Sequence, residues 1–210
     1  MKEILIIDYG VGNIRSVMRG VEICGFQPKL SSKSHDIKTA SKIILPGVGA
    51  FKDGMQGLYD RGLVDPIKEF ILTGKFFLGI CLGMQMMMTK SYEFGEHGGL
   101  NLIEGEVIPF KKNYKEKFKI PHVGWNRLKR PSNLSWDKTI LENIKNENDL
   151  YFVHSFYVQP KYEKNCLSKC NYADLDFCAV VKKENIYGCQ FHPEKSGETG
   201  LSILKSFCKK

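Results

Sequence analysis

The sequence predicts an α/β fold, with a mainly parallel sheet, helices on both faces, and added antiparallel strands in the C-terminal half. Two observations carry this prediction. In the first half, apolar runs alternate with helical repeats, which is the order of elements that produces a parallel sheet covered on both sides. In the second half, strand-like runs follow one another with few helical repeats between them. We expect the 210 residues to form one domain, over residues 1–210.

The first half begins with a near-continuous apolar strand over residues 2–8, as expected when both faces of a strand are covered. A loop over residues 9–13 precedes apolar side chains at helical spacing, and Gly25 suits the end of that helix. Further strands are expected at residues 26–30, 42–45 and 76–81, with helices at about 65–73 and beginning over 85–90.

The second half is expected to contain mainly strands. They are predicted at residues 104–110, 124–129, 150–159, 177–182 and 186–191. Glu184 and Asn185 supply a hairpin turn between the last two strands. A helix over about residues 200–208 closes the chain.

Composition and charge restrict the class of protein. Hydrophobic residues make up 42% and charged residues 26% of the chain, a balance that is typical of a folded globular protein and excludes wholesale disorder. The net charge is +8, but the lysines are scattered and no aromatic–basic platform accompanies them, so we expect no nucleic-acid partner. Because no apolar run approaches the roughly 18–20 residues that span a bilayer, we expect a cytoplasmic protein without a membrane partner.

The seven cysteines are an odd number in a chain of cytoplasmic character, which disfavours a disulfide framework. Cys166 and Cys170 are the one close pair in the sequence, and no second pair or nearby histidine completes a zinc set. We therefore expect no metal site.

Residues 79–83, Gly-Ile-Cys-Leu-Gly, carry the strongest chemical signal. They follow a predicted buried strand and precede a predicted helix, where a Gly-x-nucleophile-x-Gly turn is a nucleophile elbow. The glycines allow a tight turn that projects Cys81 above the sheet edge, and a helix N-terminus favours the thiolate. Taken alone, the motif is equally compatible with an ordinary turn around a buried thiol.

Residues 190–194, Gln-Phe-His-Pro-Glu, supply the groups that a cysteine nucleophile needs. His192 and Glu194 are two residues apart after a predicted strand, so in extended backbone their side chains point to the same side. Glu194 can accept a hydrogen bond from one ring nitrogen of His192 and leave the other facing Cys81, which is the logic of a catalytic triad. A lone His-Pro-Glu is usually a surface turn, and its occurrence together with the elbow favours the catalytic interpretation.

Residues 46–49, Pro-Gly-Val-Gly, also follow a predicted strand. A glycine-rich loop near the elbow can direct backbone N–H groups at a developing oxyanion, although by itself it is also a plain turn. Together the three segments predict acyl transfer through a thioester.

These three segments resemble the class I glutamine amidotransferases, whose fold is flavodoxin-like. Four segments are similar, more narrowly, to the glutaminase subunits of imidazole glycerol phosphate synthases. They are residues 8–13 (Asp-Tyr-Gly-Val-Gly-Asn), 121–126 (Pro-His-Val-Gly-Trp-Asn), 154–157 (His-Ser-Phe-Tyr) and 191–196 (Phe-His-Pro-Glu-Lys-Ser). The resemblance covers nearly the whole chain, in order.

The resemblance implies that Cys81 attacks the carboxamide of L-glutamine, that His192 transfers the proton, and that Glu194 holds His192. No cofactor is implied. The oxyanion hole would be built by Gly47, Val48, Gly49 and Leu82, and the glutamine pocket would be lined by Gln85, Glu93, Ser155 and Tyr157. Glu93 is equally compatible with a surface position.

The resemblance also implies a partner, because ammonia in this family passes to a separate (β/α)8-barrel cyclase subunit. That subunit makes imidazole glycerol phosphate and an aminoimidazole carboxamide ribotide in histidine biosynthesis. A barrel needs about 200–250 residues, so the cyclase would be a second chain in a heterodimer. The docking face is expected at Asn13, His122, Trp125, Asn126 and Lys195, although a core position for Trp125 is about as compatible with its residue type.

Other interpretations stay open at this point. Residues 92–100 are similar to stretches in amidotransferases of surface-sugar biosynthesis, so the main alternative is the same glutaminase chemistry serving a sugar-amidating synthetase. A non-catalytic regulatory module is a third interpretation, and the intact set of Cys81, His192 and Glu194 argues against it. The three methionines at residues 86–88 are expected in the core, and the lysine-rich residues 111–119 are expected to form a loop without an assigned function.

Overall fold

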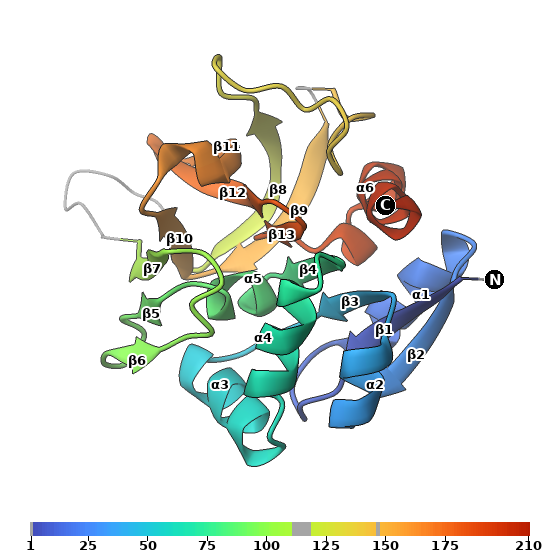
Figure 1. Ribbon diagram of the computed structural model, residues 1–210. Coiled ribbons are helices and arrows are strands. Elements are labelled where there is room, and N and C mark those ends of the chain that lie inside the picture. The colour runs from blue at the N-terminus through green and yellow to red at the C-terminus, as the bar shows by residue number, and fades with distance from the viewer. Residues whose placement is uncertain (1, 111–118, 146–147) are drawn as a thin grey trace.

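The computed structural model describes residues 2–110, 119–145 and 148–210, so nearly all of the loop expected at residues 111–119 lies outside the described residues. In these ranges thirteen strands form one mixed sheet, whose main path is β2-β1-β3-β4-β13-β12-β10-β7-β5-β6 (Figure 1). The parallel part of the path consists of β2 (Gln27–Ser31), β1 (Glu3–Ile7), β3 (Lys42–Leu45), β4 (Phe76–Ile80) and β13 (Ile186–Cys189).

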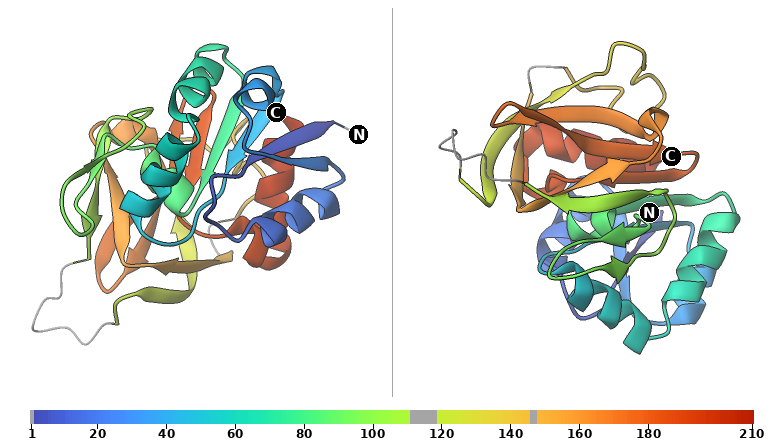
Figure 2. Two further views of the ribbon diagram at one scale, coloured as in Figure 1. Left: turned by 90° about the horizontal axis from the view of Figure 1, so that it is seen from below. Right: turned by 90° about the vertical axis from the view of Figure 1, so that its left-hand side faces the viewer.

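Helices cover both faces of the parallel strands, as predicted (Figure 2). One face packs against α1 (Ile14–Ile23) and α6 (Gly197–Lys209), and the other against α2 (Ser34–Thr39), α3 (Phe51–Asp60) and α4 (Val64–Leu72). In β1, Ile4 and Ile6 point into the first core, whereas Leu5 and Ile7 point into the second. Because both faces of this strand are buried, its residues from Ile4 to Ile7 are all apolar.

The C-terminal half adds antiparallel strands, as predicted, although one of them, β11 at Cys166–Tyr172, was not expected from the sequence. They are β7 (Gly105–Pro109), β8 (His122–Lys129), β9 (Asp149–His154), β10 (Phe156–Pro160), β11 (Cys166–Tyr172) and β12 (Leu175–Lys183), with short β5 (Lys90–Ser91) and β6 (His97–Gly98) at the edge of the sheet. Two 3₁₀ turns, η1 (Glu163–Asn165) and η2 (Pro193–Lys195), complete the elements. The hairpin predicted at Glu184 is confirmed, because Lys183 in β12 pairs with Ile186 in β13.

The helix after the elbow differs from the prediction. It is α5 (Leu82–Met86), which begins directly after Cys81 and ends where the predicted helix was expected to begin. The helix stops because the carbonyl groups of Met86, Met87 and Met88 accept hydrogen bonds of 2.8–3.1 Å from the backbone of residues 100–102. All three methionines are fully buried, which confirms their predicted place in the core.

Two further differences have local causes. The strand expected at residues 150–159 is divided at Ser155, because β9 pairs with β8 whereas β10 pairs with β7 and β12. Helix α3 was not predicted, since its glycines weaken the helical signal. At Gly57 the structure requires glycine, because a Cβ there would overlap the carbonyl group of Tyr9.

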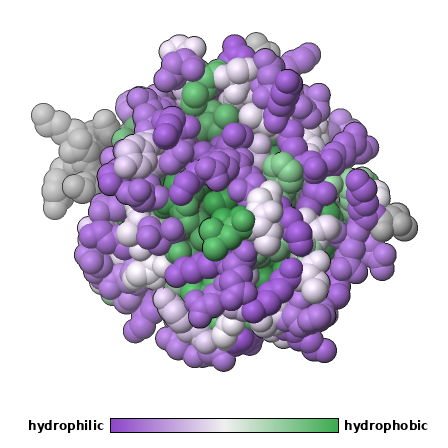
Figure 3. Space-filling view, viewed as in Figure 1, coloured by the Kyte–Doolittle hydropathy of each residue, from purple (hydrophilic) through white to green (hydrophobic). Residues whose placement is uncertain are grey.

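The carboxyl ends of β1, β3, β4 and β13 lie at one edge of the sheet, where ligands bind in open α/β sheets. The segments singled out in the sequence follow these ends. Hydrophilic side chains cover most of the face seen in Figure 1 and surround an apolar hollow in the region of α4 and α5 (Figure 3). Among the helices of the described ranges, none has the length and apolar character needed to cross a membrane.

Candidate active site

Cys81 occupies the sharp turn between β4 and α5. Its backbone has φ 54° and ψ −109°, a strained conformation for a residue with a side chain. Packing requires the flanking glycines, because a Cβ on Gly83 would overlap the Leu45 carbonyl group and one on Gly79 would lie 2.7 Å from Gly83 backbone atoms. The N–H of Cys81 donates to the Cys189 carbonyl group at 2.7 Å and fastens the turn to β13. The turn has the geometry of a nucleophile elbow.

Two polar groups contact the Cys81 sulfur. The thiol donates to the carbonyl oxygen of Val153 at 3.9 Å, and Nε2 of Gln190 donates to Sγ at 3.7 Å. The residue is 6% exposed, and it lines a cavity. Its sulfur is therefore accessible to a small molecule but shielded from bulk water.

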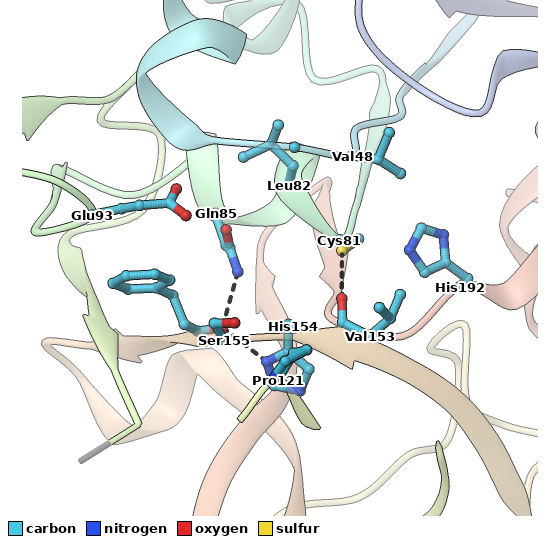
Figure 4. A pocket seen from close by; sticks show the side chains of 12 residues that line it. Val48, Cys81, Leu82, Gln85, Glu93, Pro121, Val153, His154, Ser155 and His192 are labelled. Carbon is cyan, nitrogen blue, oxygen red and sulfur yellow. Dashed lines mark hydrogen bonds between the residues drawn. The ribbon is translucent and has the colours of Figure 1, made fainter. Parts of the chain in front are cut away.

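His192 lies beside Cys81, just after β13 (Figure 4). Its Nδ1 donates to Oε1 of Glu194 at 2.8 Å, and both side chains are almost completely buried. The carboxylate can only accept, so it assigns the proton to Nδ1. The other ring nitrogen, Nε2, has no hydrogen-bond partner among the described residues, and the ring lines the same cavity as Cys81.

Electrostatics favour a protonated His192. Burial by itself lowers the pKa of His192, but the interactions with Cys81 and then with Glu194 outweigh burial and raise this pKa to about 10. The positive charge of a His192 imidazolium is therefore favoured beside Cys81 and Glu194.

The predicted oxyanion segment borders the cavity that contains Cys81 and His192, with Val48 beside His192 (Figure 4). Val48, Gly49 and Leu82 line the cavity, and Gly49 has a positive φ of 99°. Gly47 lies just beneath, where a Cβ would come within 2.7 Å of the Leu82 side chain. Three of the four predicted oxyanion residues therefore line the same cavity as Cys81, and their role stays a prediction.

Tyr9 supports this loop from below, a role that the sequence did not suggest. Its buried hydroxyl donates to the carbonyl oxygen of Pro46 at 2.7 Å, and a Cβ on Gly47 would lie 2.6 Å from it. Burial, followed by the nearby charge of Cys81, raises the pKa of Tyr9, so the hydroxyl remains a neutral donor.

The cavity that joins these groups has a volume of about 320 Å³, the size of a pocket for a small molecule. Its other lining residues are Gln85, Glu93, Pro121, Val153, His154, Ser155 and Phe156. Larger depressions of about 460 and 520 Å³ exist elsewhere, but the cavity at Cys81 is the candidate site because it contains the nucleophile and the histidine. Within the described ranges, no cluster of three or more His, Cys, Asp or Glu side chains could hold a metal ion.

The structure brings three of the four predicted glutamine-binding residues to this cavity, namely Gln85, Glu93 and Ser155. It does not bring Tyr157 there. The break in the strand at Ser155 turns the Tyr157 ring toward Phe110, with 4.9 Å between ring centres. Phe156 lines the cavity in its place.

The predicted docking residues do not all lie on the surface. Trp125 is 54% exposed and lies beside Tyr151, with 5.8 Å between ring centres, and Lys195 is exposed whereas Asn13 is half-buried. His122 is fully buried, so its expected place on a docking face is corrected.

The alternation of β8 explains this correction, since successive side chains of a strand point to opposite faces. His122 and Asn126 point inward, and Trp125 points outward. Asn126 is half-buried, with its amide donating to the Asn171 carbonyl group at 2.8 Å. Nδ1 of His122 lies 3.0 Å from Nε2 of His154 in the same interior.

Sequence reasoning assigned no role to Gln190 or His154, although both stand in the segments that it quoted. Gln190 is two residues before His192, so the spacing that paired His192 with Glu194 could have placed it on the same side. Nδ1 of His154 donates to the Phe156 carbonyl group at 2.8 Å. Burial lowers the pKa of His154 to about 3. Its contact with His122, which is 32 positions away in the chain, joins the neighbouring strands β8 and β9, and the sequence carries no signal for that pairing.

A cysteine in an elbow, an oriented histidine and a carboxylate define a triad on an α/β sheet. The family model described as "Glutamine amidotransferase class-I" matches residues 5–210, so the chain belongs to the class I glutamine amidotransferases and is an enzyme of that class.

The curated relatives narrow this class. The imidazole glycerol phosphate synthase subunit HisH 1 of Legionella pneumophila (strain Lens) is 50% identical over 210 residues, with 99% of both chains covered. HisH of Geobacter metallireducens is 46% identical over 213 residues, covering 99% of this chain and 98% of the relative. Within its class, the chain belongs to the HisH family of imidazole glycerol phosphate synthase subunits.

Solved structures agree on the fold. The structure of PurLQS from Thermotoga maritima aligns with a TM-score of 0.73 at 20% identity, covering 99% of this chain and 98% of that one. A glutamine amidotransferase aligns with a TM-score of 0.72 at 15% identity, covering 97% and 98%. At these identities the likeness shows the fold alone, and it confirms the predicted fold class.

Proposed function

We propose that this chain hydrolyses L-glutamine to glutamate and ammonia through a thioester on Cys81, and that it delivers the ammonia to a cyclase subunit of imidazole glycerol phosphate synthase. The observation that carries the proposal is the arrangement of His192. Its Nδ1 is held by Glu194 at 2.8 Å, and its unpartnered Nε2 lies in the cavity with Cys81.

The first half of the proposed reaction forms the thioester. The Cys81 thiol gives its proton to Nε2 of His192, and the thiolate attacks the carboxamide carbon of glutamine. Negative charge develops on the carboxamide oxygen, where the N–H groups of residues 47–49 and of Leu82 can stabilise it. The imidazolium then protonates the leaving nitrogen, ammonia departs, and the glutamyl group stays on the sulfur.

The second half regenerates the enzyme. His192 takes a proton from water, the hydroxyl attacks the thioester, and glutamate leaves as the sulfur takes back the bonding electron pair. The ion pair with Glu194 keeps the His192 ring in one orientation through both halves. The nearly dry surroundings strengthen each of these charge interactions.

The cavity also offers acceptors for the α-ammonium group of glutamine. Both hydrogens of the Gln85 amide are used within the protein, on the Phe156 carbonyl oxygen at 3.0 Å and on Oε1 of Gln190 at 3.1 Å. The acceptor oxygen of Gln85 is then the group left for a ligand. Oε2 of Glu93 accepts from the N–H of Phe51 at 2.6 Å, and its carboxylate lies on the same side of the cavity as Gln85 (Figure 4). Ser155 would add a hydroxyl beside them.

The proposed partner is a (β/α)8-barrel cyclase, since the curated relatives carry the name of a synthase subunit. Val123 and Trp125 lie on the exposed face of β8 and are 55% and 54% exposed. The Trp125 ring on this face is the aromatic anchor that we propose for docking. Asn13 and Lys195 remain in the proposed docking set, and His122 is left out because it is buried. Asn126 points to the inner face of β8, so it would support the docking face without lying on it.

The test is glutamine hydrolysis by the purified chain, alone and with a purified cyclase and its ribulosyl precursor. We expect weak turnover alone, strong activation with both, and complete loss in Cys81→Ala. Cys208→Ala, which trims a buried cysteine in α6, is the matched control and should keep its turnover. Retained turnover in Cys81→Ala would overturn the thioester, whereas normal turnover without activation by the cyclase would overturn the proposed partner.

A further inference from the structure

Gln190 is a fully buried amide that the triad does not use. Its backbone N–H donates to the Ala179 carbonyl group at 2.9 Å, which anchors the residue at the end of β13. Its side chain lies between two groups of the cavity wall: Oε1 accepts from Nε2 of Gln85 at 3.1 Å, and Nε2 donates to the Cys81 sulfur at 3.7 Å. Buried side-chain amides are almost always hydrogen-bonded, and here one partner is the reacting atom.

The direction of the Gln190 amide is determined by its neighbour. Nε2 of Gln85 donates both to the Phe156 carbonyl oxygen, at 3.0 Å, and to Gln190. This carbonyl oxygen can only accept, so it requires the NH₂ group of Gln85 on its side, and it is held in place because it also accepts from Nδ1 of His154 at 2.8 Å. A reversed Gln190 amide would therefore place one NH₂ group against another, so its NH₂ group is directed at the sulfur.

This contact matters most when Cys81 is ionised. A neutral thiol can donate to the Val153 carbonyl oxygen at 3.9 Å, but a thiolate cannot, and the carbonyl oxygen then faces a negative charge. The N–H of Gln190 interacts in the opposite sense, since hydrogen bonds to a charged partner are stronger than those to a neutral one. Gln190 thus opposes the unfavourable effect of the Val153 carbonyl group.

We infer that Gln190 is a catalytic residue whose amide N–H stabilises the Cys81 thiolate, and that Gln85 is the positioning residue that directs this amide at the sulfur. The inference rests on the proposed function and adds a donor to its first step. It gives Gln85 a task besides any contact with glutamine.

The test measures ionisation of Cys81 without glutamine. The rate of alkylation of the Cys81 peptide by iodoacetamide is followed by mass spectrometry across pH, and its midpoint reports the thiolate. The titratable groups around the sulfur are His192 with Glu194 behind it, Tyr9 beneath the oxyanion loop, Cys189 in β13, and His154 and Glu93, which line the same cavity. All of them remain in the variants Gln190→Met and Gln85→Met.

We expect Gln190→Met to raise the midpoint of the alkylation profile by about one pH unit. At a fixed pH below the midpoint, this shift lowers the thiolate fraction of Cys81 roughly tenfold. Gln85→Met should raise the midpoint by a smaller amount, because the Gln190 amide is then free to turn. Ser168→Ala is the matched control, since it removes a buried hydrogen bond to the Lys129 carbonyl group, 3.2 Å long and in the distant strand β11. Its midpoint should equal that of the unmodified chain.

An unchanged midpoint in a folded Gln190→Met variant would overturn the inference. If that variant does not fold, Gln85→Met decides, because an unchanged midpoint there would show that the directed amide does not act on the sulfur. Failure of the proposed function has a different signature: the unmodified chain would show the alkylation profile and its shift in the variants, but no turnover of glutamine.

Discussion

The substitution Glu194→Gln should separate activity from stability. The Glu194 side chain is completely buried. One of its oxygens holds Nδ1 of His192 at 2.8 Å, and the other has no hydrogen-bond partner among the described residues. Glutamine has the same shape, but it is neutral and carries an NH₂ group. The change therefore removes a charge-assisted hydrogen bond and a poorly solvated charge together.

The two effects on stability are opposite and similar in size. Loss of a hydrogen bond between charged groups costs about 1.5–3 kcal/mol, and removal of the buried charge returns a similar amount, because an unpaired charged oxygen is more costly to bury than an unpaired amide atom. The free energy of unfolding at pH 7 should change by no more than about 1 kcal/mol. Turnover should fall by about 10²–10³-fold, roughly 2.7–4 kcal/mol of barrier, because a neutral amide stabilises the His192 imidazolium less than a carboxylate does and can also present its NH₂ group to Nδ1, which favours the tautomer in which Nε2 cannot accept a proton.

The assay combines urea unfolding with glutamine turnover in the presence of the cyclase. Glu198→Gln, an exposed position in the first turn of α6, is the matched control and should change neither quantity. The reasoning would be refuted by a Glu194→Gln variant with unchanged kcat. It would also be refuted by a loss of more than about 3 kcal/mol of stability, since that would make Glu194 a structural residue.

Three further predictions concern the elbow, the buried histidines and the docking face. Gly83→Ala should lower the free energy of unfolding by about 3 kcal/mol or more and abolish turnover, because its Cβ would overlap the Leu45 carbonyl group. The control Gly98→Ala, which has open space around it, should change neither stability nor turnover. Thermal unfolding and a turnover assay measure the two effects. The pKa of His154 is about 3 in the folded protein and about 6.5 in the unfolded chain, so the unfolded chain takes up a proton first as the pH falls. The free energy of unfolding, measured with urea at pH 7 and pH 5, should therefore fall by up to about 1.4 kcal/mol per pH unit below 6.5. An equal fall in the variant His154→Asn would contradict this reasoning. Trp125→Ala should weaken binding to the cyclase by at least about tenfold with little change in stability. Titration calorimetry should show no such loss for the control Leu72→Ala, which trims an even more exposed apolar side chain.

The sequence by itself determined the parts of the protein that depend on local pattern. The apolar run of β1 predicted a strand buried on both faces, because both cores require apolar side chains at alternate positions. The spacing of His192 and Glu194 predicted their contact, because two residues of extended backbone return to the same side. The glycines around Cys81 predicted the turn, since no other residue fits beneath Leu45.

Only the tertiary structure decided the features that depend on contacts between distant segments. Helix α5 ends at Met86 because residues 100–102 take over its carbonyl groups. The Gln190 amide reaches Cys81 across 109 positions of the chain, and His122 is buried because its strand pairs with β9 and turns it inward. The preferences of each segment leave these outcomes open, and they are settled only when folding brings the separate hydrogen-bonding groups together in one interior where each must find a partner.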